Sequence, residues 1–167
     1  TIRRAQTVHP ISDLQIEYSL VSRSPEPAIF PVLAELGIGV TAYGVLSRGL
    51  LSGSTPASQG DFRAHLPRFT GGNRERNARL IDALQNVAAE KGASATQLAI
   101  AWVLAKSPTI VPVIGARTRA QLTESLGALQ LTLTPADLRH IEDAVPATAV
   151  AGSRYDERQM QVLDSER

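Results

Sequence analysis

Arg117 stands in the segment whose residues suggest a chemistry most directly. The stretch Gly-Ala-Arg-Thr-Arg-Ala-Gln over 115–121 places a glycine turn, then arginines, then a pattern that opens a helix. Free N–H groups and the positive end of a helix attract anions, and a guanidinium can hold a phosphate through two hydrogen bonds. The segment therefore predicts a phosphate-binding turn, although an ordinary turn with solvated arginines fits the same residues equally well.

Two further segments, at the ends of predicted strands, hold residue types that could contact a ligand. In 43–53, Tyr43 offers an aromatic face, and the glycines that follow it let the backbone approach a ligand closely. Taken alone, this stretch is more typical of a flexible loop beside a core tyrosine. The segment 15–19, Gln-Ile-Glu-Tyr-Ser, is the third place where polar groups gather.

Each of these segments ends or follows a predicted strand. Alternation and β-rich composition predict strands at Leu14–Tyr18, Ile38–Tyr43 and Ile110–Ile114. Helical spacing separates them, so the strands should be parallel, adjacent and in chain order, joined by right-handed crossovers. Function in such α/β folds gathers where the carboxyl ends of the strands meet, and all three segments lie there.

The helices that complete these units are marked by caps, prolines and apolar spacing. Ser94 and Thr118 open capping-box patterns, and Asn73 is expected to cap the helix that ends at Gly92. Helices are predicted over 1–8, 25–37, 73–92, 94–107 and 118–129, with a final helix from Thr134-Pro135. The stretch 44–72 is predicted to be a long loop, functional or disordered, and 146–167 a polar surface extension.

Composition excludes several classes of function. The chain has 167 residues and a formal net charge of +1, so no bulk charge favours nucleic acid or an acidic membrane. It has no Cys, which excludes disulfides and fits a cytoplasmic protein, and no apolar run is long enough to span a membrane. No His, Asp and Glu residues have metal-ligand spacing, and His9, His65 and His140 lack partner motifs, so we assign neither a metal nor a catalytic histidine.

The three segments together resemble successive motifs of aldo-keto reductases. They are Gln15-Ile-Glu-Tyr-Ser-Leu20, then Tyr43-Gly-Val-Leu-Ser-Arg-Gly-Leu-Leu-Ser-Gly53, then Val113-Ile-Gly-Ala-Arg117 with Gln121-Leu-Thr-Glu-Ser125. The stretches 61–69 and 154–160 are also similar to that family, so the resemblance covers essentially the whole chain. It implies one domain over 1–167, the C-terminal half of a parallel (β/α)8 TIM barrel. The chain would form about the last three βα units, with the C-terminal helix and tail, because a closed barrel needs eight strands.

The resemblance also implies an NADP(H) site. Gln15 would bind the nicotinamide carboxamide, Tyr43 would stack on the nicotinamide ring, and Arg117 would meet the 2′-phosphate. The pyrophosphate would lie along Leu46, Arg48, Gly49 and Leu51, and the adenosine near Gly115, Gln121, Glu124 and Ser125. Two positions depart from the family: Gly44-Val45 replaces a frequent Ser-Pro, and Ser125 replaces a usual Asn.

The implied activity is NADPH-dependent reduction of an aldehyde or ketone to an alcohol, with a small carbonyl compound as substrate. The family's catalytic tetrad of Asp, Tyr, Lys and His belongs to the first half of the barrel, and nothing in this chain aligns with that half. We therefore expect the chain alone to be inactive and its open side to be covered by the N-terminal half or a partner chain. The alternatives are a non-catalytic NADP-binding or regulatory module and a different barrel enzyme with its phosphate site at the last two strands.

Finally, the inner face of this open sheet can be predicted. We expect Ile16, Val40 and Val113 to lie there, with the helices on the outer side. Without the other strands these side chains would have no partners, and both outer strands would offer unpaired backbone groups. An isolated chain of this kind is expected to be unstable as a monomer.

Overall fold

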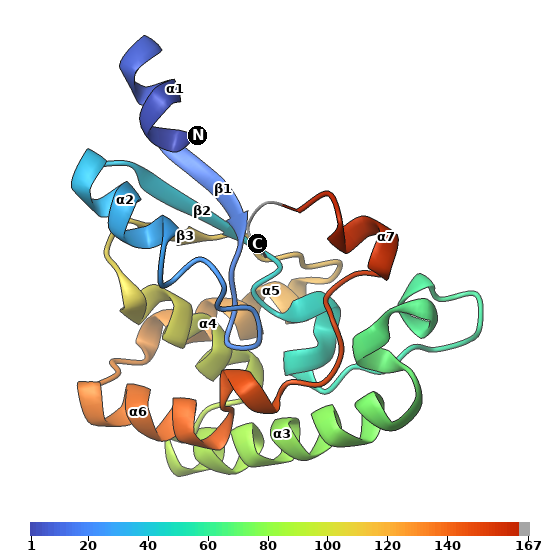
Figure 1. Ribbon diagram of the computed structural model, residues 1–167. Coiled ribbons are helices and arrows are strands. Elements are labelled where there is room, and N and C mark those ends of the chain that lie inside the picture. The colour runs from blue at the N-terminus through green and yellow to red at the C-terminus, as the bar shows by residue number, and fades with distance from the viewer. Residues whose placement is uncertain (164–167) are drawn as a thin grey trace.

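The computed structural model describes residues 1–163, and its centre is a parallel sheet with strand order β1-β2-β3 (Figure 1). The strands are β1 (Asp13–Glu17), β2 (Gly39–Tyr43) and β3 (Ile110–Pro112). Gln15 is paired with Thr41, which in turn is paired with Val111. The predicted order and direction of the strands are confirmed. β3 is shorter than predicted, although the Val113 N–H still donates to the Ala42 carbonyl at 2.8 Å.

The two faces of the sheet differ from the prediction. Val40 is 4% exposed and packs in the core, and Ile16, in register with Ala42, packs against the same core. Both therefore face the helices, and placing them on the inner face was wrong. The reason is that the helices bury the apolar set of the alternation, which leaves the polar set on the open face. Val113 is 51% exposed and does lie on the open side.

Most of the predicted helices are present. They are α1 (Ile2–Val8), α2 (Ile29–Leu36), α3 (Gly71–Glu90), α4 (Ala95–Lys106), α5 (Arg119–Leu126), α6 (Pro135–Ala144) and α7 (Glu157–Met160). The capping boxes at Ser94 and Thr118 are both formed. Asn73 is not a cap, because α3 begins earlier, after Thr70, and the Asn73 amide instead donates to the Pro67 carbonyl at 3.1 Å. α6 is not the last helix, since α7 follows it.

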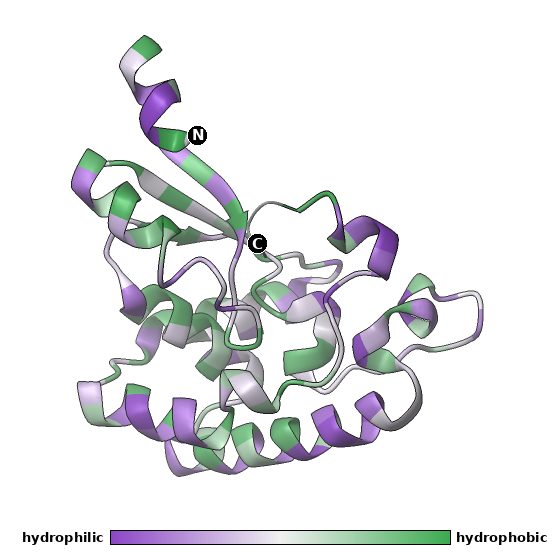
Figure 2. Cartoon of the chain, in the orientation of Figure 1, coloured by the Kyte–Doolittle hydropathy of each residue, from purple (hydrophilic) through white to green (hydrophobic). Residues whose placement is uncertain are grey.

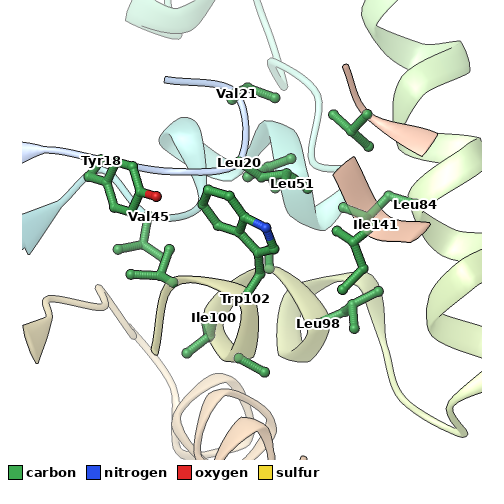
Figure 3. Close-up of a cluster of buried hydrophobic side chains, with 14 of the residues drawn as sticks. Tyr18, Leu20, Val21, Val45, Leu51, Leu84, Leu98, Ile100, Trp102 and Ile141 are labelled. Atoms are coloured by element: carbon green, nitrogen blue, oxygen red, sulfur yellow. The ribbon is translucent and has the colours of Figure 1, made fainter. Parts of the chain in front are cut away.

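The core lies between the sheet and the helices α3, α4 and α6 (Figures 1 and 3). Trp102 of α4 is fully buried, and its ring centre lies 5.4 Å from that of Tyr18, which follows β1. Leu84, Leu98 and Ile141 bring the three helices together around it. Figure 2 shows hydrophobic residues along much of α4, whereas α6 carries more hydrophilic ones. α4 is thus the central helix, buried on several sides.

The loop over 44–72 has more structure than predicted. It contains three short 3-10 helices, η1 (Ser47–Ser52), η2 (Phe62–His65) and η3 (Pro67–Phe69). Arg63 organises its outer part through Asp61, whose pKa it holds well below the usual range. Arg68 anchors the inner end of the loop through hydrogen bonds to the Val21 and Gly152 carbonyls. Arg63 thus bonds within the loop and Arg68 bonds to distant segments, and the Gly, Ser and Pro content of the loop revealed neither.

The predicted extension over 146–167 is described only as far as residue 163. It includes η5 (Ala147–Ala149) and α7, and in Figure 1 it runs past η1 toward the carboxyl ends of the strands. Its last residues, 164–167, lie outside the described part of the chain. No helix within the described residues is both long and apolar enough to cross a membrane.

Candidate functional site

A groove of about 570 Å³ opens where β2 and β3 end, between the loop that follows β2 and the start of α5. Most of the residues predicted to bind the cofactor line it: Leu46, Arg48, Gly49, Gly115, Arg117, Gln121, Glu124 and Ser125. They come from two segments more than sixty positions apart in the chain, which the parallel pairing of β2 and β3 brings to one edge. This is the edge where ligands bind in α/β folds.

One wall of the groove is a tight turn after β2. Ser47 and Arg48 both have left-handed backbone angles, with φ of 47° and 56°, and Gly49 follows at 90°. The Gly49 N–H donates to the Leu46 carbonyl at 2.9 Å, which closes the turn. Non-glycine residues rarely adopt these angles, and such strain gathers at functional sites.

The opposite wall is the start of α5. The Gln121 side-chain oxygen accepts hydrogen bonds from the N–H groups of Arg117, at 2.8 Å, and Thr118, at 3.2 Å. These two N–H groups are therefore satisfied within the turn and are not offered to a ligand. The Arg117 guanidinium is exposed, and no ion pair to a described residue ties it down. The turn would therefore bind an anion through the charged side chain of Arg117, and less through free backbone N–H groups.

α4 holds this wall in place. The Ser94 hydroxyl donates to the Glu124 carboxylate at 3.0 Å, and the Gln97 amide donates to the Glu124 carbonyl at 3.1 Å. Ser94 and Gln97 also form the capping box of α4. The cap of one helix therefore fixes the position of the next, and Glu124 is engaged by it.

Gln15 and Tyr43 lie beside the groove and do not line it. Tyr43 ends β2, and strand alternation places it on the same open face as Gln15, which is exposed on β1. Tyr43 is half-buried. This burial, followed by the neighbouring Tyr155 hydroxyl and the Glu17 carboxylate, raises the pKa of the Tyr43 hydroxyl. Like any tyrosine near pH 7, its ring is neutral and can present an apolar face.

Leu51, predicted to lie along the pyrophosphate largely through its backbone, is not among the residues that line the groove. It is fully buried in the core, and its N–H donates to the Leu46 carbonyl at 3.2 Å. The 3-10 turn η1 points Leu50 and Leu51 inward, where their burial stabilises the loop. Leu51 therefore supports the groove from behind and does not line it.

Sequence reasoning missed a charged cluster at the end of β1, formed by Glu17, Arg48, Arg154 and Tyr155. Glu17 is 1% exposed, and its Oε2 lies 3.4 Å from Arg154 Nη1 and 3.9 Å from Arg48 Nη2. The Arg48 guanidinium lies 4.4 Å from the centre of the Tyr155 ring. A buried carboxylate requires a positive partner. The only signal in the sequence was an acid at a strand end together with the Arg-Tyr pair in the tail, and no spacing rule joins them.

The histidines lie apart from the groove and contact local surface groups. His65 is 3.1 Å from the Gln59 carbonyl, and His140 is 3.1 Å from the Glu90 carboxylate. His9 is 2.9 Å from the Pro10 carbonyl. Within residues 1–163, no three His, Asp or Glu side chains are grouped as metal ligands.

Comparison with known proteins gives one consistent result. The sequence model of the aldo/keto reductase family matches residues 1–146. The chain is 40% identical over 159 residues to "Probable aldo-keto reductase 1" of Glycine max, covering 93% of this chain and 46% of that protein. Its fold matches a glycerol dehydrogenase of Gluconobacter oxydans with a TM-score of 0.81 at 27% identity, covering 93% of this chain and 48% of the other.

A second solved structure agrees in fold. A thermostable aldo-keto reductase, solved with the inhibitor epalrestat, matches with a TM-score of 0.57 at 24% identity, over 78% of this chain and 38% of the other. The chain thus spans about half the length of the relatives it matches. A different family of barrel enzymes is excluded by the family match over 1–146. With its parallel sheet and with the motif residues gathered at the carboxyl ends of its strands, the chain belongs to the aldo/keto reductase family.

Proposed function

We propose that this chain is the NADP(H)-binding half of an aldo-keto reductase that reduces a small aldehyde or ketone to its alcohol. The observation that carries the proposal is the groove in which Arg48 and Gly49 of one segment and Arg117 of another line the same cavity. Arginines suit phosphate because their planar donors match its oxygens. We also propose a cytoplasmic location, which the cysteine-free sequence fits because disulfides are rare there.

The residues present fit the cofactor. A Cβ added at Gly115 would meet no atom within 4 Å, so the groove has open space at this turn. Arg117, whose guanidinium is exposed, would hold the 2′-phosphate. The backbone around Leu46 to Gly49 would pass along the pyrophosphate, and Glu124 and Ser125 would lie beside the adenosine. When bound, NADPH supplies the hydride that reduces the carbonyl carbon.

The nicotinamide end would lie at the open face of the sheet. Tyr43 would present its ring, and Gln15 would donate from β1 to the carboxamide oxygen. These contacts orient the ring and exclude water from one of its sides. The proton for the carbonyl oxygen would come from the tetrad tyrosine of the first half of the barrel. We therefore propose that this half, in the same polypeptide or a partner chain, covers the open face.

Aldehyde-dependent oxidation of NADPH tests the proposal. The complete protein, with its barrel closed, should consume NADPH only when an aldehyde or ketone is present. The measurement is the loss of absorbance of the reduced ring at 340 nm. The chain of 167 residues alone should give no turnover. Binding of NADPH by the complete protein without turnover on any carbonyl would instead favour a non-catalytic, regulatory module. Absence of NADPH binding would contradict both.

A further inference from the structure

The turn that carries Arg48 into the groove is strained. Ser47 and Arg48 are the only non-glycine residues of the described chain with positive φ, and they are consecutive. In L residues this conformation crowds Cβ against the following carbonyl, so an isolated turn of this sequence would favour other conformations. It persists only where surrounding contacts over-determine it. Some group outside the turn must therefore hold it.

One such group is Arg63, whose Nη1 donates to the Arg48 carbonyl at 3.2 Å. The group that holds Ser47 is Arg68. It lies in η3, is 7% exposed, and its Nη1 donates to the Ser47 hydroxyl at 3.0 Å and to the Ser22 hydroxyl at 3.0 Å. Its Nη2 donates to the Val21 carbonyl at 2.8 Å, and its Nε to the Gly152 carbonyl at 3.4 Å. One planar guanidinium thus joins the loop after β1, the turn after β2 and the tail. A side chain with fewer or more flexible donors could not meet all four acceptors.

We infer that Arg68 is a positioning residue for the cofactor: it holds Ser47 in the left-handed conformation and so places Arg48 and Gly49 on the groove. Arg68 itself does not line the groove. Ser47 is 1% exposed, and its N–H donates to the Gly44 carbonyl at 2.7 Å. Its conformation is therefore fixed from both the backbone and the side chain. The inference deepens the proposed function and rests on it for the identity of the ligand.

Glycine at position 47 separates this role from a general effect on stability. Glycine adopts positive φ without strain, so Ser47→Gly removes the strain at position 47 and with it the need for Arg68 to hold that residue. Arg68→Met should release the turn from its conformation. The double variant, Arg68→Met with Ser47→Gly, should recover that conformation in part. Arg23→Met is a matched control. Arg23 is also a largely buried arginine that donates to two backbone carbonyls, Leu20 at 2.9 Å and Val145 at 2.9 Å, but it does not touch the turn.

Two measurements on the complete protein decide the matter. Hydrogen exchange of the peptide 44–54 reports the turn without a ligand, and a titration with NADPH reports the groove. Arg68→Met should speed exchange of 44–54 and raise the Kd for NADPH by about tenfold, the population cost of one strained residue. Adding Ser47→Gly to Arg68→Met should lower both the exchange rate of 44–54 and the Kd for NADPH at least threefold relative to Arg68→Met alone. Arg23→Met should lower the melting temperature and leave both measurements unchanged.

Several outcomes would overturn the inference. If Arg68→Met melts earlier but keeps the exchange and the Kd of the parent, Arg68 is structural only. If the double variant exchanges as fast and binds NADPH as weakly as Arg68→Met alone, Arg68 is again structural only. Should Arg68→Met not fold, Ser47→Ala removes only the bond between the two side chains and must still speed exchange of 44–54. If exchange responds as expected while neither the parent nor any variant binds NADPH, the proposed function fails, and only the part of the inference that Arg68 holds the turn stands.

Discussion

At the scale of single residues, the groove relies on charge more than on free backbone donors. The start of α5 satisfies its own N–H groups through Gln121, which leaves the Arg117 guanidinium as the exposed donor on that wall. Arg48 is different, because it is partly engaged by the Tyr155 ring and lies 3.9 Å from Glu17. The two arginines therefore have separate tasks. Under the proposed function, Arg117 would recognise the 2′-phosphate that distinguishes NADP(H) from NAD(H).

Replacement of Arg117 tests this selectivity. A charge-assisted hydrogen bond contributes about 1.5–3 kcal/mol. Arg117→Ala in the complete protein should thus raise the Kd for NADPH roughly tenfold or more and leave that for NADH nearly unchanged, as measured by fluorescence titration. Arg119→Ala, which removes a neighbouring exposed arginine that does not line the groove, is the control and should change neither constant. Equal losses for NADPH and NADH would show that Arg117 holds the pyrophosphate or the fold.

At the scale of elements, local signals predicted what depends on local chemistry. The capping boxes at Ser94 and Thr118, the strand order and the stop at Gly37 followed from short sequence patterns. The structure of the loop over 44–72 did not, because Arg68 stabilises it through partners as distant in sequence as Val21 and Gly152. Long-range bonds of this kind leave no periodic trace. The motif residues, by contrast, could be placed because the resemblance gave their roles and the parallel sheet gave their common edge.

Gly44, at the end of β2, links strand and groove. Its φ is +67°, and an added Cβ would lie 3.0 Å from Glu17 Cγ, a side chain buried beside Arg154. Gly44→Ala should therefore destabilise the complete protein by about 1–2 kcal/mol, lowering the melting temperature by several degrees in a thermal scan. Gly115→Ala is the matched control, because nothing lies within 4 Å of its added Cβ. Identical melting temperatures for the two variants would contradict the strain assigned to Gly44.

At the scale of the whole molecule, the sheet is covered on one face only. The helices pack against Val40, Ile16 and their neighbours, while Val111 and Val113 are 62% and 51% exposed on the other side. β1 and β3 are outer strands, and no described strand pairs with their free edges. The hydrophobic inner face predicted from Ile16 and Val40 is replaced by a mixed one with Gln15 and Thr41. The open face thus carries exposed side chains such as Val111 and Gln15, and the open edges of β1 and β3 favour pairing with another chain.

The chain of 167 residues on its own should therefore self-associate and melt at low temperature. Sedimentation equilibrium should show species larger than the 17.8 kDa monomer, and thermal melting should lack a cooperative step above about 60 °C. Val111→Lys places a charge on the exposed face of the outer strand β3, where it costs little burial, and should shift the distribution toward monomer. Helix content in circular dichroism should be unchanged by this substitution. A parent chain that sediments as a monomer and melts cooperatively above that temperature would show that the open sheet needs no cover, and the proposal of a completing half would lose its physical basis.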